Sequence, residues 1–171
     1  MNSGELKAVQ APLKIQYRDD PSLAKITLLA KGRLGDESIT CKVETGKKMV
    51  EAGLHPKTGG DGLSLCSGDM LLEALVACAG VTLKAVSTSL GLQIKDGTVK
   101  AEGDLDFRGT LGVAKEIPVG FTDIRLIFEL TTDAPQELLE TLVKLTERYC
   151  VVYQTLRDVP RLSSSFQVLG R

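Results

Sequence analysis

Tryptophan is absent from the sequence, and phenylalanine and tyrosine are scarce. The chain therefore lacks the aromatic side chains on which proteins that bind single-stranded nucleic acids stack successive bases. Its formal net charge of −1 gives no electrostatic attraction to a nucleic acid or to an anionic membrane. These absences argue against both classes of partner and leave a small molecule or another protein.

Metal ligands are also few. The only histidine is His55, and the four cysteines, Cys41, Cys66, Cys78 and Cys150, lie far apart with no CxxC spacing. Zinc sites need several such ligands at close spacing, so we expect no metal site. The N-terminal residues lack the basic start and apolar run of a secretory signal, which predicts a cytoplasmic protein. In that reducing compartment a pair of cysteines is either redox-active or simply buried.

The length of the chain fits one domain, residues 1–171, and no linker or repeat divides it. Residues 13–18, 24–33 and 38–44 alternate apolar and polar side chains, which predicts three strands of an antiparallel meander. A polar, glycine-rich segment follows at residues 53–69. Loops of this length inside a compact domain are often functional.

Residues 68–90 favour a helix and carry very few charges. A helix that is apolar on nearly every side belongs either in the core of a soluble protein or in a membrane. Glu73, Lys84 and the Ser/Thr-rich end argue against a membrane span. We therefore expect a core helix, with Gly91 in position to end it.

Strand patterns return at residues 92–109, where Asp-Gly pairs predict turns or bulges, and at residues 119–132. A second helix is predicted from Asp133, which can cap it, with Pro135 in its first turn. Its apolar stripe consists of Leu138, Leu142, Leu145, Tyr149 and Val152. Residues 163–170 predict a short final strand that returns to the sheet. Two long helices with antiparallel strands define an α+β fold.

Each predicted helix carries a cysteine on an apolar line. Cys78 follows Leu75 at helical spacing, and Cys150 follows Thr146 in the same way. Two long apolar helices in a small domain pack against each other, so these two thiols could be neighbours. The alternative is that both are ordinary buried side chains, the commonest role of a free cysteine. Neither lies at the N-terminus of a predicted helix, so a reactive thiolate here would need a nearby cation.

The order of these elements and two helix motifs resemble the OsmC/Ohr family of thiol-dependent peroxidases. The first motif, LLEALVACAGVTL, contains Cys78 and is similar to a family context that reads LLxALxxC. The second, ERYCVVYQTL, contains Cys150 and is similar to a family helix that reads roughly CPxxxTL. The resemblance extends from about Ala24 to Val168, nearly the whole chain. Either motif alone is weak, but both in this order are a specific signal.

The resemblance implies a thiol-dependent peroxidase. In this mechanism a hydroperoxide oxidises Cys78 to a sulfenic acid, Cys150 resolves it to a disulfide, and an external dithiol reduces the disulfide. Arg33, in the stretch KGRLGD, matches a family arginine that favours the thiolate and orients the peroxide. Without the resemblance, Arg33 would be interpreted as an arginine in a turn whose side chain is exposed to solvent. No organic or metal cofactor is implied, because sulfur carries the electrons. An apolar lining suits organic hydroperoxides, and we expect it from Leu71, Leu75 and Tyr149.

The resemblance also implies the architecture and the assembly. The family fold wraps antiparallel sheets around two long central helices and forms an intertwined homodimer. A second chain would cover the face of the helix at residues 68–90 that its own sheet leaves bare.

Two positions depart from the family pattern. Gly68 stands where peroxidase members have a glutamate that binds the arginine; the adjacent Asp69 can substitute or cap the helix, and Glu73 lies one turn later. Val151 replaces the usual proline after the second cysteine, which predicts a helix that continues through Cys150. The alternative function is therefore a non-catalytic, OsmC-like module that senses thiol oxidation or binds a ligand and has lost efficient peroxide turnover.

The remaining candidates are single residues. Cys66 lies just before the first long helix and is either an alternative thiol for the same site or incidental. Cys41 alternates with Ile39 and Val43 along a predicted strand, which predicts a core position. No role is assigned to His55.

Overall fold

The computed structural model of the chain describes residues 2–20, 23, 31–34, 40–45, 48–112 and 114–169. Its first element is a helix, α1 (Ser3–Asp19). A capping box starts it, because the Glu5 amide donates to the Asn2 side chain and the Asn2 amide donates to the Glu5 carboxylate, both at 2.9 Å. The strand predicted for residues 13–18 is therefore wrong. So short an alternation also fits a helix, and the apolar Leu13 and Ile15 are exposed on it.

The N-terminal sheet has the strand order β1-β2-β3-β4. Its strands are β1 (Lys31–Leu34), β2 (Thr40–Thr45), β3 (Lys48–Gly53) and β4 (Leu65–Cys66). The first three are antiparallel. The pairing of the strands predicted at residues 24–33 and 38–44 is therefore confirmed for their described residues, whereas the third strand of the meander is β3, which was not predicted. Residues 24–30 and 38–39 lie outside the described residues. The segment predicted as a loop contains a short 3₁₀ helix, η2 (Pro56–Thr58), and β4, which pairs in parallel with β3.

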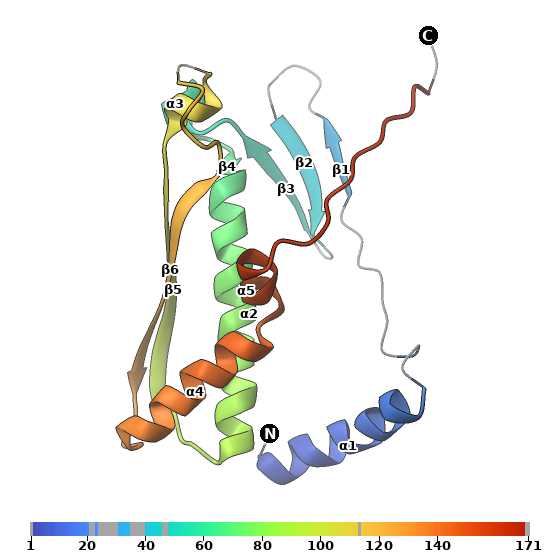
Figure 1. Cartoon of the computed structure of the whole chain (residues 1–171), viewed down its shortest axis with the longest axis vertical. Coiled ribbons are helices and arrows are strands. Elements are labelled where there is room, and N and C mark those ends of the chain that lie inside the picture. Colours follow the sequence, from blue (N-terminus) through green and yellow to red (C-terminus); the bar gives the residue numbers. More distant parts are fainter. Residues whose placement is uncertain are drawn as a thin grey trace.

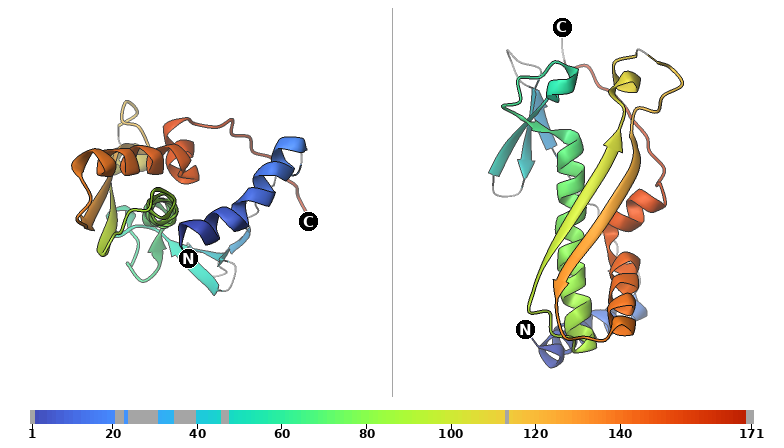
Figure 2. Two further views of the ribbon diagram at one scale, coloured as in Figure 1. Left: turned by 90° about the horizontal axis from the view of Figure 1, so that it is seen from below. Right: turned by 90° about the vertical axis from the view of Figure 1, so that its left-hand side faces the viewer.

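The long helix α2 (Ser67–Leu90) confirms the helix predicted for residues 68–90. Gly91 ends it as predicted, in the left-handed conformation with φ of 69°, and its amide donates to the Thr88 carbonyl. One line of α2 is buried, formed by Leu75, Ala79, Leu83 and Ser87. The helix α2 packs against a two-stranded ribbon and against the two C-terminal helices (Figures 1 and 2).

The second sheet is a long antiparallel ribbon of β5 (Asp96–Leu105) and β6 (Phe121–Thr131). The short helix α3 (Phe107–Thr110) follows β5. Both predicted strands are confirmed. The Asp-Gly pair at Asp96 lies at the start of β5. The register of the ribbon shifts only between Asp104 and Leu105. Apolar side chains on one face pack against α2, among them Val99, Ala101, Ile124, Leu126 and Phe128. The opposite face carries ion pairs centred on Arg125.

Two helices, α4 (Gln136–Tyr149) and α5 (Val151–Arg157), replace the single helix predicted for this region. The chain is extended at Cys150, with φ of −74° and ψ of 110°, so the prediction that the helix continues through Cys150 is wrong. The predicted cap at Asp133 is also wrong, because Pro135 occupies the N-cap position and Asp133 pairs with Lys95. The buried side chains of α4 are Leu142 and Thr146, and Cys150, directly after the helix, is also buried.

After α5 the chain has no regular structure in residues 159–169. The strand predicted for residues 163–170 is therefore wrong within the described residues. In Figure 1 this segment leaves α5 as an extended trace, and Phe166 is 93% exposed. A strand needs a free sheet edge alongside it, and no described strand pairs with this segment.

Candidate functional site

The structure brings the two helix cysteines together. Cys78 lies in the middle of α2, and Cys150 lies at the junction of α4 and α5. Cys78 packs against the cluster that contains Cys150, and the Cys150 side chain lowers the pKa of Cys78. Cys150 is fully buried in a cluster with Leu75 and Ala79, whereas Cys78 is only partly buried. The prediction that these thiols are neighbours is confirmed.

The junction at Cys150 decides which backbone groups face the thiols. The Cys150 amide still donates to the Thr146 carbonyl at 2.9 Å, and the Cys150 carbonyl accepts from Gln154 at 2.9 Å. The Tyr153 amide donates to Cys150 Sγ at 3.5 Å, so Cys150 caps α5 with its own sulfur. The expectation that neither thiol lies at a helix N-terminus is therefore wrong for Cys150.

Hydrogen bonds control the ionisation of Cys78. Burial raises the pKa of its thiol, but the Val152 amide, the Cys150 side chain and the Val151 amide bring the pKa below its ordinary value. The Thr82 hydroxyl donates its hydrogen to the Cys78 carbonyl, at 2.8 Å. Within the described residues these donors are neutral groups and not cations. The structure thus stabilises a thiolate at Cys78 by a means that the sequence did not indicate, since we expected a cation there.

Cys150 has the opposite tendency. Burial raises its pKa, and the adjacent Cys78, as a hydrogen-bonding and charged neighbour, raises it further despite the donation from the Tyr153 amide. The pair therefore favours one arrangement of protons, with a thiolate at Cys78 and a neutral thiol at Cys150. A thiolate beside a neutral thiol is suited to nucleophilic attack by the first sulfur.

The supporting residues predicted around this pair are not gathered beside it in the described structure. The backbone of Arg33 lies in β1 opposite Lys42, and its side chain is outside the described residues, so its contact with Cys78 stays a prediction. Asp69 is in the first turn of α2, whose N-cap is Cys66, so the cap reading for Asp69 is wrong. Asp69 and Glu73 line an open cavity of about 420 Å³ that Cys78 does not line.

The third described cysteine belongs to another cavity. Cys66 lies twelve residues before Cys78, which is about 18 Å along a helix. It lines a hollow of about 320 Å³ that also contains His55 and Phe107, whose rings stack with centroids 4.8 Å apart. This separation disfavours Cys66 as an alternative thiol for the pair. The side chain of Cys41 is outside the described residues.

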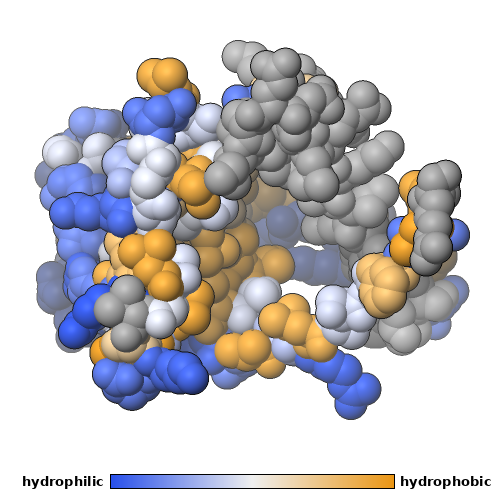
Figure 3. Space-filling view, turned by 90° about the horizontal axis from the view of Figure 1, so that it is seen from above, coloured by the Kyte–Doolittle hydropathy of each residue, from blue (hydrophilic) through white to orange (hydrophobic). Residues whose placement is uncertain are grey.

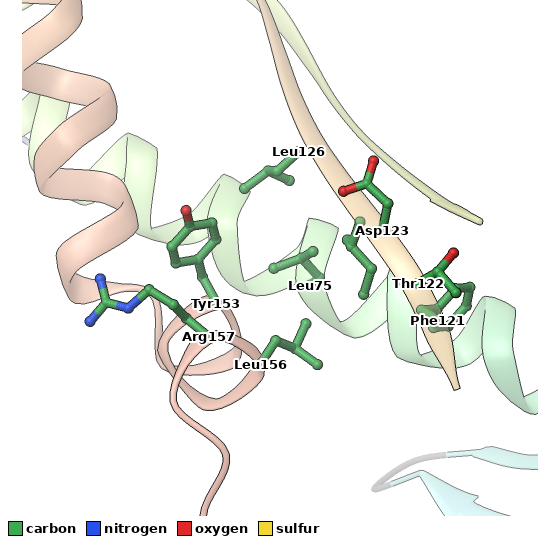
Figure 4. A pocket seen from close by; sticks show the side chains of 9 residues that line it. Leu75, Phe121, Thr122, Asp123, Leu126, Tyr153, Leu156 and Arg157 are labelled. Carbon is green, nitrogen blue, oxygen red and sulfur yellow. The ribbon is translucent and has the colours of Figure 1, made fainter. Parts of the chain in front are cut away.

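A pocket of about 330 Å³ with both polar and apolar side chains in its lining adjoins the cysteine pair (Figure 4). Its lining consists of Leu75, Phe121, Thr122, Asp123, Ile124, Leu126, Tyr153, Leu156 and Arg157. Leu75 and Tyr153 also pack in the cluster around Cys150, so the pocket and the thiols share a wall. Leu75 was predicted, but Leu71 and Tyr149 do not line this pocket. Tyr149 is 60% exposed beside the Arg148 guanidinium.

Tyr153 was missed by the sequence analysis because its position depends on the junction at Cys150. On a continuous helix, a residue three positions after Cys150 lies on the same side as Cys150, but nothing indicated a pocket there. Among the described residues, no group of three or more His, Cys, Asp or Glu side chains is arranged to hold a metal ion.

Comparison with known proteins identifies a family match and solved structures with a similar fold. Residues 59–165 match the family described as OsmC-like protein. An OsmC-like protein from Mycoplasma pneumoniae has a similar structure, with 16% identity, a TM-score of 0.65, and coverage of 79% of this chain and 90% of that one. No curated protein sequence matches the chain significantly.

Two further solved structures carry more specific names. An organic hydroperoxide resistance protein OsmC from Legionella pneumophila has 18% identity and a TM-score of 0.60, covering 78% of this chain and 90% of that one. The organic hydroperoxide resistance protein OhrB of Bacillus subtilis has 18% identity and a TM-score of 0.54, covering 78% and 93%. At these identities the likeness establishes the fold.

Proposed function

The chain belongs to the OsmC-like protein family, and from this premise we propose that it is a thiol-dependent peroxidase that reduces organic hydroperoxides. The observation that carries the proposal is the packing of Cys78 against the cluster of Cys150, in a pair where the pKa of Cys78 is lowered and that of Cys150 is raised. The names of the similar Legionella and Bacillus proteins support the same class of substrate.

The proposed reaction uses the sulfur atoms alone. The Cys78 thiolate attacks the terminal oxygen of the hydroperoxide, the O–O bond breaks, and the released alkoxide takes up a proton to leave as an alcohol. Cys78 is then a sulfenic acid. The Cys150 sulfur attacks it, water leaves, and a Cys78–Cys150 disulfide forms. An external dithiol reduces this disulfide to two thiols and is itself oxidised, so that no metal or organic cofactor takes part.

The apolar part of the pocket beside the pair supports an organic substrate. Leu75, Leu126 and Leu156 face the same space in Figure 4 and offer an apolar surface to the carbon chain of a hydroperoxide. Hydrogen peroxide would gain nothing from this surface. Arg33 is proposed to orient the peroxide oxygens, as the family resemblance implies, and Asp69 or Glu73 to support that arginine.

The assembly and location belong to the same proposal. We infer a homodimer in the cytoplasm, in which the second copy covers the exposed side of α2. Val81, on that helix, is 74% exposed although its side chain is apolar.

Peroxide turnover tests the proposed function. The full chain is mixed with cumene hydroperoxide and a small dithiol, and loss of peroxide is compared for the wild type, Cys78→Ser, Cys150→Ser and the matched control Cys66→Ser. We expect Cys78→Ser to abolish turnover, Cys150→Ser to remove most of it, and Cys66→Ser to retain it. Equal rates in all four proteins would exclude the proposed mechanism.

The second candidate is an OsmC-like module that senses oxidation or binds a ligand without efficient turnover. Gly68, in place of the family glutamate, favours it. Mass spectrometry after one equivalent of peroxide separates the two candidates. A Cys78–Cys150 disulfide that forms once, with no continuing peroxide loss in excess dithiol, would support the sensor; continuing loss would support the peroxidase.

A further inference from the structure

The hollow beside Cys66 gathers aromatic rings in a chain that has few of them. It has a volume of about 320 Å³, and its lining includes the only histidine, His55, and two of the four phenylalanines, Phe107 and Phe121. These rings come from the segment after β3, from α3 and from the start of β6, which meet at the end of the molecule where α2 begins (Figure 1). The mechanism proposed above uses neither His55 nor Phe107.

Local contacts fix the positions of these rings. The His55 and Phe107 rings stack with centroids 4.8 Å apart and planes at 25°. The Lys57 amide donates to His55 Nδ1 at 3.0 Å, so the neutral imidazole carries its proton on Nε2. The Phe121 ring lies over Gly103, where a Cβ atom would come within 2.5 Å of its Cε1 atom. The hollow therefore has a preformed aromatic wall.

Gly68 leaves this hollow open. A Cβ atom at Gly68 would lie 3.4 Å from the Phe121 ring and 3.6 Å from Cys66 Sγ. A longer side chain at position 68 would thus start between two residues that line the hollow. The departure from the family pattern at Gly68 leaves room for a ligand here.

The charges around the hollow are negative. Asp69 and Asp104 line it, and among the described residues no lysine or arginine side chain does. Asp104 is one of three carboxylates that share Arg125, so this cluster carries an excess of two negative charges. The local potential therefore attracts a cation to the hollow.

We propose that this hollow is a binding site for a small organic cation of the substituted-ammonium class. The face of an aromatic ring attracts a cation, and the alkyl groups on the nitrogen pack against the rings. A bare metal ion fits less well, because the described residues hold no group of three or more ligands for it. Neither Cys78 nor Cys150 lines the hollow, so the inference goes beyond the proposed peroxidase function and does not depend on it.

Choline and its uncharged isostere 3,3-dimethylbutan-1-ol are the probes, each titrated into the reduced full chain at constant ionic strength. Because His55 is the only histidine, its ring protons give one set of NMR signals. We expect choline to shift these signals saturably in the millimolar range, with NOEs from its methyl protons to the Phe107 ring. The isostere should bind at least about fivefold more weakly. Equal affinities for the two probes, or no saturable shift with choline, would overturn the proposal.

Two variants with matched controls separate the ring from the charge. Phe107→Leu should weaken choline binding by about three- to tenfold, whereas Phe166→Leu, at a 93% exposed phenylalanine, should leave it unchanged. Asp69→Asn should weaken binding of choline but not of the isostere, whereas Glu137→Gln, in the first turn of α4, should alter neither.

Folded Phe107→Leu and Asp69→Asn variants that both bind choline as the wild type does would contradict the site. If these variants do not fold, the comparison of the two probes on the wild type still decides the matter. All readouts are independent of peroxide turnover, so an inactive wild type that binds choline would refute the proposed function and not this inference.

Discussion

At the level of single residues, the two thiols of the site should depend on pH in different ways. The pKa of Cys78 is lowered and that of Cys150 is raised. A thiol ionises as the pH rises through its pKa, and only the thiolate reacts with iodoacetamide. We therefore expect Cys78 to reach its full alkylation rate at a lower pH than a free cysteine, and Cys150 at a higher pH.

Initial alkylation rates of the wild type, separated by mass spectrometry, measure both profiles, with N-acetylcysteine amide as the reference thiol. Initial rates are needed because alkylation of Cys78 removes the charge that raises the pKa of Cys150. Labelling of Cys150 ahead of Cys78 at neutral pH would contradict the assignment of the nucleophile.

The pairing of the two thiols could be predicted because it depends on helical spacing and on the packing of two apolar helices. Cys78 and Cys150 each lie on a regular apolar line, and such lines survive small errors in helix boundaries. The donors around Cys78 could not be predicted, because the amides of Val151 and Val152 become available only where the helix breaks. No proline or glycine marks that break, so tertiary packing and not local sequence sets it.

At the level of elements, the packing of α4 on α2 predicts a sharp difference between two leucines on one helix. Leu142 is completely buried, whereas Leu138, one turn earlier, is 41% exposed. Truncation of a fully buried leucine leaves a cavity, so Leu142→Ala should lower the free energy of unfolding by about 3 kcal/mol. Leu138→Ala should lower it by less than about 1 kcal/mol.

Urea unfolding of the reduced protein measures both changes, provided that the slope with denaturant concentration is the same for each variant. If both variants lost the same free energy of unfolding, Leu138 would be as buried as Leu142. The buried face of α4 would then be the one predicted from the sequence, which includes Leu138 and Tyr149.

The elements that the sequence predicted correctly are those with long, strong patterns. The helix at residues 68–90 and the strand at residues 119–132 are both long enough for their periodicity to be unambiguous. Residues 13–18 and 163–170 show only short alternations, which a helix or an extended segment satisfies equally well.

At the level of the whole molecule, α2 is more apolar than its surroundings in one chain explain. It is the one helix of the described residues that is long and apolar enough to cross a membrane, by length and composition alone. One line of it is buried, while Leu71, Val81 and Leu90 are between 39% and 74% exposed. In the view along the long axis, hydrophobic side chains lie open in the hollow centre of the molecule (Figure 3). Apolar side chains exposed along a helix of this composition are the basis on which we propose that a partner covers part of it.

A second copy of the chain is the partner that we propose, and the mass in solution tests it. Sedimentation in detergent-free buffer should give twice the 18.3 kDa mass of one chain. Val81→Asp should shift this mass to that of a single chain without unfolding it, because a charge costs little on an exposed helix position but a great deal in an apolar interface. Leu111→Asp, which alters a 55% exposed leucine in the turn after α3, is the control and should leave the mass at two chains. A wild type that sediments as one chain, or that binds lipid vesicles in place of a second copy, would refute the dimer, because the exposed face of α2 would then be either uncovered or covered by lipid.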